Sequence, residues 1–540
     1  MSKRQIYLPV IIALSVVAGV LISTLMQDDG RQHMFQNEQS AQNKLTAMLD
    51  FISENYVDSV NKAQLIEDAI PEFLEKLDPH SVYIPAKDLE EMNEPLEGNF
   101  EGIGIQFNMR HDTLLVLHTI SGGPSETAGV KPGDRIITVD DSVIAGNNIS
   151  THDIMKMLKG EKGTEVELGI KRKGQDSLIH FTIVRDEIPL YSVDVSYMAG
   201  DKTGYIKISS FSNTTYSEFV SATRKLKAKG MSKLILDLRS NSGGIMDGAN
   251  KIVDEFLTGG KMIVYTEGRK HKKTEIYSSD ERRSLVNVDV AVLIDEFSAS
   301  ASEIVAGAIQ DNDRGWIIGR RSFGKGLVQE PVKFNDGSAL RLTVARYHTP
   351  SGRCIQKPYE ESIDEYYQDV IDRYMNDEFV KPDSIDLNDS LKYKTTKGRT
   401  VYGGGGIMPD IFVPMDTTGN SELYQKIQNK NLVYEFAFKY TEEHRSRLSK
   451  HEDVASLVRD LKNHQVFSDF IDFVETKGIE IKPVQLKRSR KTLKTQVHAM
   501  ISRNILSDEG FYPVISQVDT TFQKALQVLQ EDKALIKETD

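Results

Sequence analysis

The spacing of apolar residues changes several times along this chain, and each change predicts a different kind of structure. Residues 28–96 hold apolar side chains at helical spacing, for example in LTAMLDFISENYV, and predict a helical N-terminal region. Residues 97–187 contain short strand-like runs such as GIGIQF and EVELGIKR, separated by turns rich in glycine and proline. One short helix, HDIMKMLKG, lies among them. We therefore expect a small β-rich domain after the helical region.

Strand-like and helix-like segments then alternate. The strands are predicted at KLILDLRS, VDVAVLID and WIIG, and the helices between them at MDGANKIVDEFL and SEIVAGAIQ. This alternation predicts βαβ units and a parallel sheet, in a domain that spans residues 188–415. Residues 360–400 are charged and poor in strand pattern, which indicates an insertion in that domain. Residues 416–540 predict amphipathic helices.

The first residues differ from the rest of the chain. Lys3 and Arg4 precede an uncharged stretch, Ile6 to Met26, that is long enough to span a bilayer as a helix. The positive flank predicts that residues 1–27 anchor the chain in an inner membrane as a single pass, with the remainder on the periplasmic side. A cleaved signal segment is the alternative, but no small-x-small cleavage site precedes Gln27.

Composition narrows the possible functions. A chain of 540 residues is too long for one core, so three or more units are expected. The net charge of −12 argues against nucleic acid as a partner, because phosphate contacts need a basic surface. The basic run KRSRKTLK, at 487–494, is interpreted as a solvated helix face rather than a contact for lipid or nucleic acid. The chain has one cysteine, so no internal disulfide can form.

Three loops of the predicted parallel sheet could form a catalytic site. SNSGG, the turn FSASAS and RRSFGKG each follow a predicted strand, so all three are expected at the carboxyl edge of the sheet. They contain a glycine pair, a serine at a helix start, and Lys325. A lysine activates a serine hydroxyl only when the lysine is neutral, and burial favours that form. These residues alone leave open a purely structural interpretation, in which Ser298 or Ser300 caps the helix and Lys325 is a solvated loop residue.

The run SASASE followed by FGKGLVQ resembles the active-site signature of the carboxyl-terminal processing peptidases, or tail-specific proteases. LDPHSVYI, LILDLRSNSGG and GGGGIMPDI resemble further landmarks of this family, in the family's order. The resemblance implies a Ser–Lys dyad in which Ser300 is the nucleophile, Lys325 is the base and Gln329 orients the lysine. It also implies an α/β protease core of the crotonase or ClpP-like kind.

The same resemblance implies how the reaction would be assisted. The donors to the oxyanion would be the N–H of Ala301 and the N–H of Gly243 or Gly244, and the sequence leaves the choice between the two glycines open. Such a dyad needs no metal ion and no cofactor.

The β-rich block resembles a PDZ domain inserted before the protease core. Such domains bind an extended peptide at a sheet edge and hold its terminal carboxylate on backbone N–H groups. Here Ile103, Gly104 and Ile105, within NFEGIGIQF, would supply those donors. Ile154 and Leu158, four residues apart on the short helix, would face the groove or the domain core.

The sequence thus predicts a serine endopeptidase that recognises the free C-terminus of a protein substrate and cleaves through an acyl-enzyme. The alternative is a membrane-anchored PDZ binding or assembly protein on a catalytically silent protease-like body. In that interpretation the helices of 416–540 would self-associate or bind an adaptor protein.

Overall fold

The computed structural model describes most of the chain, and the described residues are 41–109, 112–120, 122–359, 363–385 and 387–531. The chain divides into two compact units, residues 1–85 and residues 86–540. The described part of the first unit contains α2 (Ala41–Asn55), α3 (Lys62–Glu75) and β1 (Val82–Ile84). These helices agree with the predicted helical N-terminal region.

None of the helices in the described parts of the chain is long and apolar enough to cross a membrane. This finding contradicts the predicted single-pass location in an inner membrane. The longest described helix, α15 (Pro483–Ile515), has 33 residues but includes the basic run at 487–494, and charged residues are costly in a bilayer. The predicted anchor, residues 1–27, lies outside the described residues.

The second unit begins with α4 (Leu89–Glu97) and a β-rich domain. Its main sheet is antiparallel, with the order β3-β4-β5-β7-β8 and with β6 paired to β5, while β2 pairs with β9. The α6 helix packs on this sheet through a shared apolar core that includes Ile154 and Leu168. The elements are β2 (Asn99–Gly102), β3 (Ile105–Met109), β4 (Leu114–Thr119), α5 (Pro124–Ala128), β5 (Arg135–Val139), β6 (Ser142–Val143), α6 (Thr151–Leu158), β7 (Glu165–Lys171), β8 (Ile179–Val184) and β9 (Asp186–Pro189).

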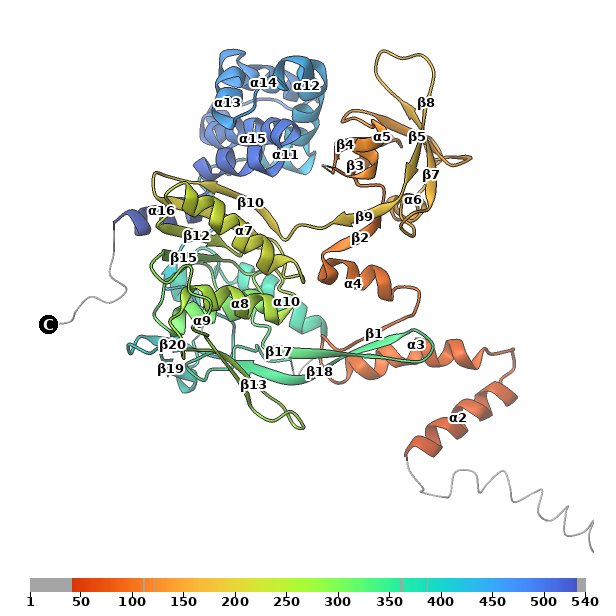
Figure 1. Cartoon of the computed structure of the whole chain (residues 1–540), viewed down its shortest axis with the longest axis vertical. Helices are drawn as coiled ribbons and strands as arrows, with labels where there is room; N and C mark the ends of the chain where they lie inside the picture. Colours follow the sequence, from red (N-terminus) through yellow and green to blue (C-terminus); the bar gives the residue numbers. More distant parts are fainter. Residues whose placement is uncertain (1–40, 110–111, 121, 360–362, 386, 532–540) are drawn as a thin grey trace, which may run out of the picture. The chain divides into compact units, whose positions relative to one another are not determined.

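An α/β core follows, built on a six-stranded sheet with the order β10-β11-β12-β15-β16-β21. All neighbours are parallel except β10, which is antiparallel to β11. The predicted parallel βαβ units are therefore confirmed (Figure 1). The elements are β10 (Val193–Met198), β11 (Thr203–Ile208), α7 (Thr215–Ala228), β12 (Lys233–Asp237), α8 (Met246–Phe256), β15 (Asp289–Ile294), α9 (Ala301–Asp311), β16 (Trp316–Gly319) and β21 (Ile411–Phe412).

A second, antiparallel group of strands accompanies this sheet. β17 (Leu327–Lys333) forms a hairpin with β18 (Ala339–His348), β18 pairs with β13 (Met262–Glu267), and β13 pairs with β14 (Thr274–Tyr277). The segment 360–400, predicted as an insertion, is partly structured. It contains α10 (Ile363–Met375), two short 3-10 turns (Pro382–Ser384 and Asp389–Leu391), and β19 (Lys392–Lys394), which pairs with β20 (Thr400–Tyr402).

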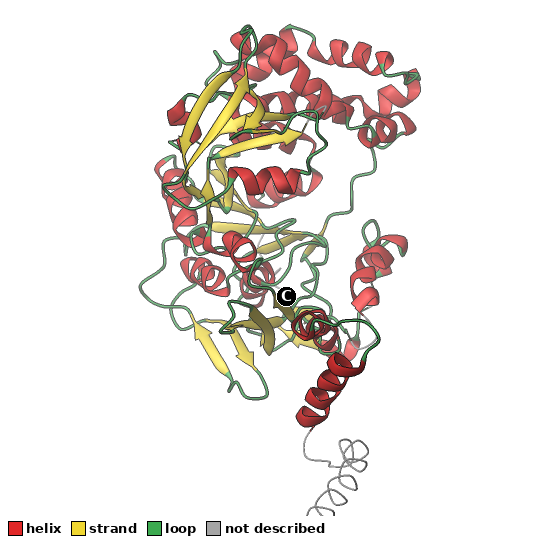
Figure 2. Ribbon diagram, turned by 90° about the vertical axis from the view of Figure 1, so that its right-hand side faces the viewer, coloured by secondary structure: helices red, strands yellow, loops and turns green. Residues whose placement is uncertain are grey.

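Helices without strands make up the described chain after residue 416, as the amphipathic pattern predicted; they are blue in Figure 1, and Figure 2 draws all described helices in red. Five of them, α11 to α15, share one apolar core. The long α15 contains a kink at Leu506 and Ser507, whose backbone angles are not helical. The helices are α11 (Glu422–Asn429), α12 (Leu432–Leu448), α13 (Val454–Asn463), α14 (Val466–Thr476), α15, the 3-10 turn Ser516–Val518, and α16 (Thr520–Gln530).

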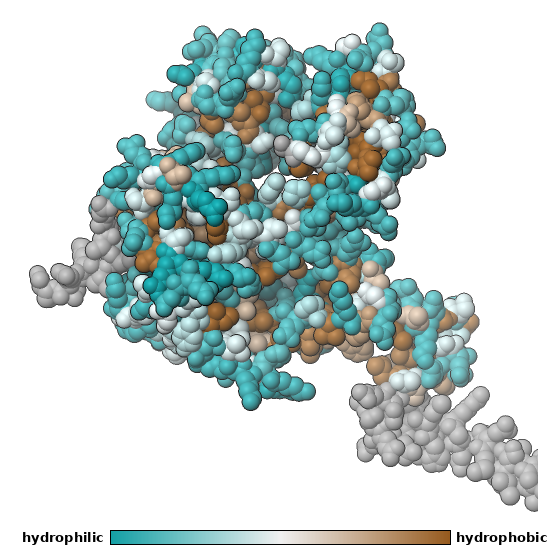
Figure 3. All heavy atoms as spheres, in the orientation of Figure 1, coloured by the Kyte–Doolittle hydropathy of each residue, from teal (hydrophilic) through white to brown (hydrophobic). Residues whose placement is uncertain are grey.

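The two faces of the six-stranded sheet belong to different cores. Leu234 and Val292 pack in the core that includes α7, α8 and α9. Their chain neighbours Ile235 and Leu293 point the other way, as alternate residues of a strand do, and pack with Phe522 of α16. The C-terminal helix is therefore part of the α/β core. Hydrophilic residues cover most of the face shown in Figure 3, with hydrophobic residues in small patches between them.

Candidate active site

Three loops meet at the carboxyl edge of the six-stranded sheet, as the alternating pattern predicted. The N–H of Ala299 donates to the carbonyl of Asn241 at 3.0 Å, and the N–H of Phe323 donates to the carbonyl of Ser298 at 3.0 Å. Main-chain hydrogen bonds thus join the loop after β15 to the loops after β12 and β16. Residues far apart in sequence share one site here because parallel strands end at the same edge.

The three serines of the FSASAS turn have different surroundings. The hydroxyl of Ser298 donates to the carbonyl of Leu238 at 2.8 Å, and the hydroxyl of Ser302 donates to the carbonyl of Asn241 at 2.9 Å, and both side chains are fully buried. Ser300, between them, is partly exposed and starts α9 with φ 55° and ψ −114°. Such backbone strain in a residue other than glycine is concentrated at functional sites. The hydroxyls of Ser298 and Ser302 are therefore used in hydrogen bonds that stabilise the turn. Ser300 remains as the nucleophile candidate.

The carboxylate of Glu303 joins the start of α9 to the loop that contains Lys325. It accepts hydrogen bonds from the N–H of Ser300 at 2.8 Å, Gly324 at 2.8 Å and Lys325 at 2.9 Å, and from the hydroxyl of Ser322 at 2.5 Å. Burial raises the pKa of Glu303 to about 7, although these donors favour the charged form. One buried side chain thus holds the backbone of both predicted dyad residues.

Tyr347, on β18, makes a second link between the same two residues. Its hydroxyl lies 2.6 Å from the carbonyl oxygen of Lys325, to which it donates, and 3.1 Å from that of Ser300. Burial raises the pKa of the Tyr347 hydroxyl well above its usual value, so the proton stays on the oxygen. The sequence analysis missed both links. Glu303 had a local signal, a serine three residues before a glutamate at a helix start, whereas Tyr347 had none.

The side chain of Lys325 points to Gln329. Its Nζ donates to the Gln329 Oε1 at 3.2 Å, and both side chains are partly exposed. Gln329 lies on β17, the strand that follows the Lys325 loop, so the hairpin positions the acceptor. In the described parts of the chain, no group of three or more His, Cys, Asp or Glu side chains could hold a metal ion.

The glycine pair packs directly against the nucleophile candidate. A Cβ on Gly243 would stand 2.6 Å from the Cβ of Ser300 and 2.9 Å from the nitrogen of Ala301, and φ there is +100°. The N–H of Gly243 donates to Asn241 Oδ1 at 2.8 Å, so this donor is engaged within its own loop. Within the described residues, the N–H of Gly244 makes no such bond to a neighbouring side chain. The N–H groups of Gly244 and of Ala301, at the start of α9, therefore remain candidate donors.

The segment predicted as an insertion supports the lysine loop. Arg373 of α10 is buried, and it donates to the carbonyls of Arg321 at 2.7 Å and Ser322 at 3.1 Å. Glu378 accepts from both guanidinium groups, at 2.9 Å from Arg373 and 2.7 Å from Arg321. The segment is thus bonded to the main chain three and four residues before Lys325.

Comparison with known proteins shows the family to which this chain belongs. The family described as Peptidase family S41 matches residues 202–364, and the PDZ domain family matches residues 102–183. The carboxy-terminal-processing protease of Bartonella bacilliformis is 36% identical over 347 residues, which are 63% of this chain and 79% of that protein. The chain belongs to the family of carboxy-terminal processing proteases. It is a protease with an S41 core and a PDZ domain, which confirms the resemblance found in the sequence.

Further relatives and family models also match this protein. Carboxy-terminal processing protease CtpB of Bacillus subtilis is 35% identical over 320 residues, which are 59% of this chain and 66% of that protein. A peptide complex of the PDZ domain of a Vibrio cholerae carboxy-terminal protease is 33% identical and covers 17% of this chain and 99% of that one, with a TM-score of 0.16. Residues 21–88 match a family described as the activating protease CtpB N-terminal domain. Residues 423–507 match a family of unknown function. Nothing in these comparisons supports the predicted adaptor contacts of 416–540.

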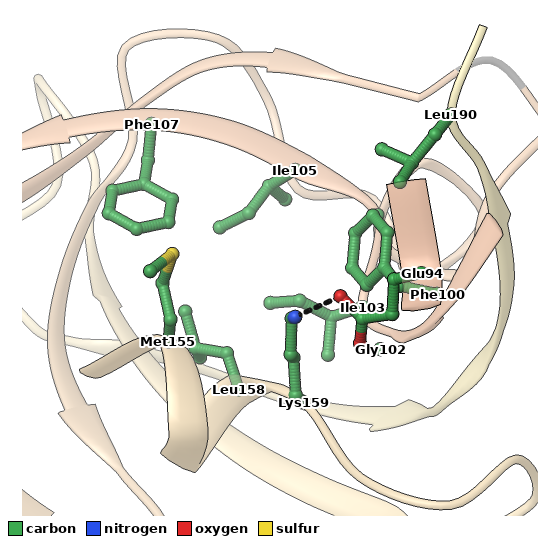
Figure 4. Close-up of a pocket in the computed structure, with 11 residues that line it drawn as sticks. Glu94, Phe100, Gly102, Ile103, Ile105, Phe107, Met155, Leu158, Lys159 and Leu190 are labelled. Carbon is green, nitrogen blue, oxygen red and sulfur yellow. Dashed lines mark hydrogen bonds and ion pairs between the residues drawn. The ribbon is translucent and has the colours of Figure 1, made fainter. Parts of the chain in front are cut away.

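The PDZ domain of this protease contains a cavity of about 220 Å³ between β3 and α6 (Figure 4). Of the residues predicted for peptide binding, Ile103, Gly104, Ile105 and Leu158 line it. Ile154 instead lies fully buried in the domain core, which was the other position foreseen for it. Its neighbour Met155 and, from β3, Phe107 line the cavity as well, and the sequence analysis named neither.

An ion pair also lines this cavity. The Nζ of Lys159, directly after α6, lies 2.5 Å from the Oε2 of Glu94 on α4, and the same Nζ is 5.2 Å from the centre of the Phe100 ring (Figure 4). The side chain of Lys159 is 30% exposed and that of Glu94 is 16% exposed. An apolar groove with one cation can hold an apolar peptide end and its carboxylate.

Proposed function

We propose that this protease is a serine endopeptidase with a Ser–Lys dyad, in which Ser300 is the nucleophile and Lys325 the general base. The observation that supports this most strongly is the Glu303 carboxylate, which accepts hydrogen bonds from the N–H groups of both residues. A dyad needs two side chains from separate loops in a fixed relation, and a buried carboxylate that bonds both backbones supplies such a constraint.

In the proposed reaction the neutral amine of Lys325 takes the proton from the Ser300 hydroxyl as its oxygen attacks the scissile carbonyl. The negative charge that develops on the carbonyl oxygen is stabilised by the N–H groups of Ala301 and Gly244. The hydrogen bond from the Lys325 Nζ to the Gln329 Oε1 fixes the orientation of the amine. The Lys325 ammonium then protonates the leaving amine, and the substrate's acyl group stays on Ser300 as an ester.

A water molecule completes the cycle. Lys325 removes a proton from that water, whose oxygen attacks the ester carbonyl. The second tetrahedral intermediate collapses with transfer of the proton to the Ser300 oxygen, and a product with a new carboxylate leaves. Apart from substrate and water, every group in these steps belongs to this chain.

We further propose that the PDZ cavity binds the free C-terminus of the substrate. The apolar side chains from β3 and α6 would take the last side chain of the substrate, and the backbone at Ile103, Gly104 and Ile105 would receive its carboxylate. The ammonium of Lys159, which is paired with Glu94, also lines this cavity. The preceding extended segment of the substrate would supply the bond to be cleaved.

Turnover of an unfolded protein with an apolar, free C-terminus tests both proposals. We expect wild-type protein to cleave it and the Ser300→Ala and Lys325→Ala variants to lose at least about 10³-fold in kcat/KM, as removal of a dyad member does in serine peptidases. All three should bind the substrate equally well in an anisotropy assay, and amidation of its C-terminus should weaken binding in all three.

Two results would contradict these proposals. If Lys325→Ala retains wild-type turnover, another group is the base. If wild-type protein binds the substrate but none of the three proteins cleaves it, the chain is a binding protein on a silent protease-like body.

A further inference from the structure

A second cavity, of about 400 Å³, lies in the C-terminal helical region, far in sequence from the residues of the active site. We call it the tail cavity. It is lined by the end of α13, by Gln465 in the following turn, by the first half of α14 and by one face of α15. The residues of α15 that line it are Leu486, Arg490, Lys494 and His498, which recur every four positions and therefore share one face of the helix.

This spacing divides the basic run at 487–494 into two groups. Arg490 and Lys494 line the tail cavity, whereas Lys487 is exposed and lies outside it. The sequence predicted a solvated face for the whole run. Arg490 is exposed and Lys494 half-buried, so the run is largely solvated as predicted, and helical periodicity turns only some of its basic residues towards the cavity.

The charges around the tail cavity have one sign. Lys462 of α13 joins Arg490 and Lys494, and no acidic residue lines the cavity within the described chain. Among the described residues, none of these three cations forms a salt bridge. The guanidinium of Arg490 lies over the ring of Phe467, 5.3 Å from its centre, which holds the cation against the cavity wall.

His498, one of the residues that line the cavity, has a buried polar atom without a partner in the described part of the chain. His498 is 3% exposed, and among the described atoms its Nε2 is buried without a hydrogen bond. Burial, together with the charges of Lys494 and Lys462, lowers the pKa of His498 to about 4. An unpaired buried polar group is costly and is rare in folded proteins, so this nitrogen indicates a missing partner.

The helix start in the cavity points to the sign of that partner. α14 has 11 residues, and its N-cap residue Gln465 makes no side-chain hydrogen bond to the first turn. The first-turn residues Val466, Phe467 and Ser468 line the cavity. The N–H of Ser468 donates to the carbonyl of Gln465 at 2.7 Å. The remaining N–H groups of this turn favour an anion, in the same direction as the three cations.

We propose that the tail cavity binds a small organic anion, a carboxylate or phosphate group joined to an apolar body. The cations Lys462, Arg490 and Lys494 and the start of α14 would hold the charged group, and His498 would gain its missing hydrogen-bond partner. The apolar part of the wall, which includes Leu461, Ile471 and Leu486, would contact the apolar body. The site is independent of the proposed peptidase mechanism.

Calorimetric titration of the full chain with benzoate, phenyl phosphate and benzamide tests this site. Benzamide has nearly the shape of benzoate but no charge. We expect saturable binding of benzoate, phenyl phosphate or both, and the tighter of the two identifies the preferred acid. Benzamide should bind at least about tenfold more weakly, which is the size of one charge-assisted hydrogen bond.

Variants of the cations locate the binding. Lys494→Gln and Lys462→Gln should each weaken binding of the preferred anion about fivefold or more, whereas the matched variant Lys487→Gln should bind like wild type. Binding should also move the ring signals of His498 in the NMR spectrum, and these signals are assigned by their loss in His498→Gln. Thermal unfolding checks that each variant is folded, and two independent lysine variants guard against one that is not.

Three outcomes would overturn the proposal. They are equal binding of benzamide and benzoate, which would show an apolar cavity only; unchanged binding in both lysine variants; and no saturable binding of either anion. Cleavage activity is not measured in any arm, so failure here is distinguishable from failure of the dyad assignment.

Discussion

Asp519 holds Arg239 by two hydrogen bonds, at 3.0 Å and 2.6 Å, across 280 residues of sequence. Asp519 is also the N-cap of α16, where it accepts from the N–H of Phe522 at 3.0 Å. Arg239 follows β12, binds the buried Asp237 at 2.6 Å, and directly precedes the loop that contains Gly243. The last described helix is thus tied to the loop that packs against the nucleophile candidate.

Asp519→Ala should therefore weaken both stability and catalysis. The change leaves Arg239 with one of its two carboxylate partners, so we expect the free energy of unfolding to fall by about 1–3 kcal/mol. Cleavage by the folded fraction should also fall, because the loop beside Ser300 is less restrained. Urea unfolding and turnover measure the two effects. The exposed Asp472→Ala is the control, and equal behaviour of the two variants would contradict the prediction.

Gly243→Ala should abolish cleavage even though the variant still folds. The added Cβ would stand 2.6 Å from the Cβ of Ser300 and 2.8 Å from the carbonyl oxygen of Ala299, so the active-site backbone must shift. Gly230→Ala is the matched control, because φ there is +88° and no atom lies within 4 Å of the added carbon. We expect both variants to lose about 1 kcal/mol or more of stability from positive φ, but only Gly243→Ala to lose activity. Activity retained in Gly243→Ala would show that the loop can move away.

The carboxyl group of Glu303 should make stability depend on pH. Its folded pKa of about 7 lies above the unfolded value of 4.5, so the folded state binds the proton more tightly. Stabilisation by this proton is full below about pH 4.5 and is lost as pH rises towards 7. Relative to Glu303→Gln, wild type should therefore lose stability over that range, by an amount on the order of 3 kcal/mol.

Urea unfolding of both proteins between those pH values measures this difference. The amide of Glu303→Gln replaces one of the two acceptor oxygens by an NH₂ donor, which would face either the N–H groups of Ser300 and Lys325 or the donors of Ser322 and Gly324. Turnover should therefore fall in the variant at every pH. A difference in stability that is constant with pH would contradict the raised pKa.

Arg373→Met should weaken the support of the loop that contains Lys325, although Arg373 lies on a different element. The change keeps a long side chain but leaves the carbonyls of Arg321 and Ser322 without this donor and the buried Glu378 with one cation fewer. Breaking such a buried pair costs about 3–5 kcal/mol. We expect lower stability and a lower kcat with little change in the binding of a C-terminal peptide, as measured by unfolding, turnover and anisotropy. Lys381→Met, which removes an exposed ion pair with Asp377, should change none of these.

Glu94→Gln should strengthen binding of peptides with a free C-terminus. The change removes the carboxylate that neutralises Lys159, so the cation becomes available to the peptide carboxylate. Because the pair is partly exposed, we expect a gain of about two- to fivefold in affinity. Anisotropy with the Ser300→Ala protein measures it, and the amidated peptide, which should show no gain, is the control. Weaker binding of the free acid by Glu94→Gln would mean that Glu94 supports the groove instead.

The sequence by itself determined the kind of fold and the place of the site. Apolar periodicity is a local property, so it indicated the β-rich domain, the parallel βαβ core and the terminal helices directly from the chain. Because parallel strands end at one edge, the same pattern predicted that the loops of Gly243, Ser300 and Lys325 meet there. The family resemblance then distinguished the three serines by their flanking residues.

Only the tertiary structure decided which polar side chains hold this site. Tyr347, Arg373 and Asp519 contact the loops of the candidate active site, or the residue just before them, across tens to hundreds of residues, and no local pattern records a partner so distant. The face of a helix is decided in the same way: Met155 rather than Ile154 lines the PDZ groove, and Lys494 rather than Lys487 lines the tail cavity. Spacing defines which residues share a face, but packing against a neighbouring element decides which face is covered.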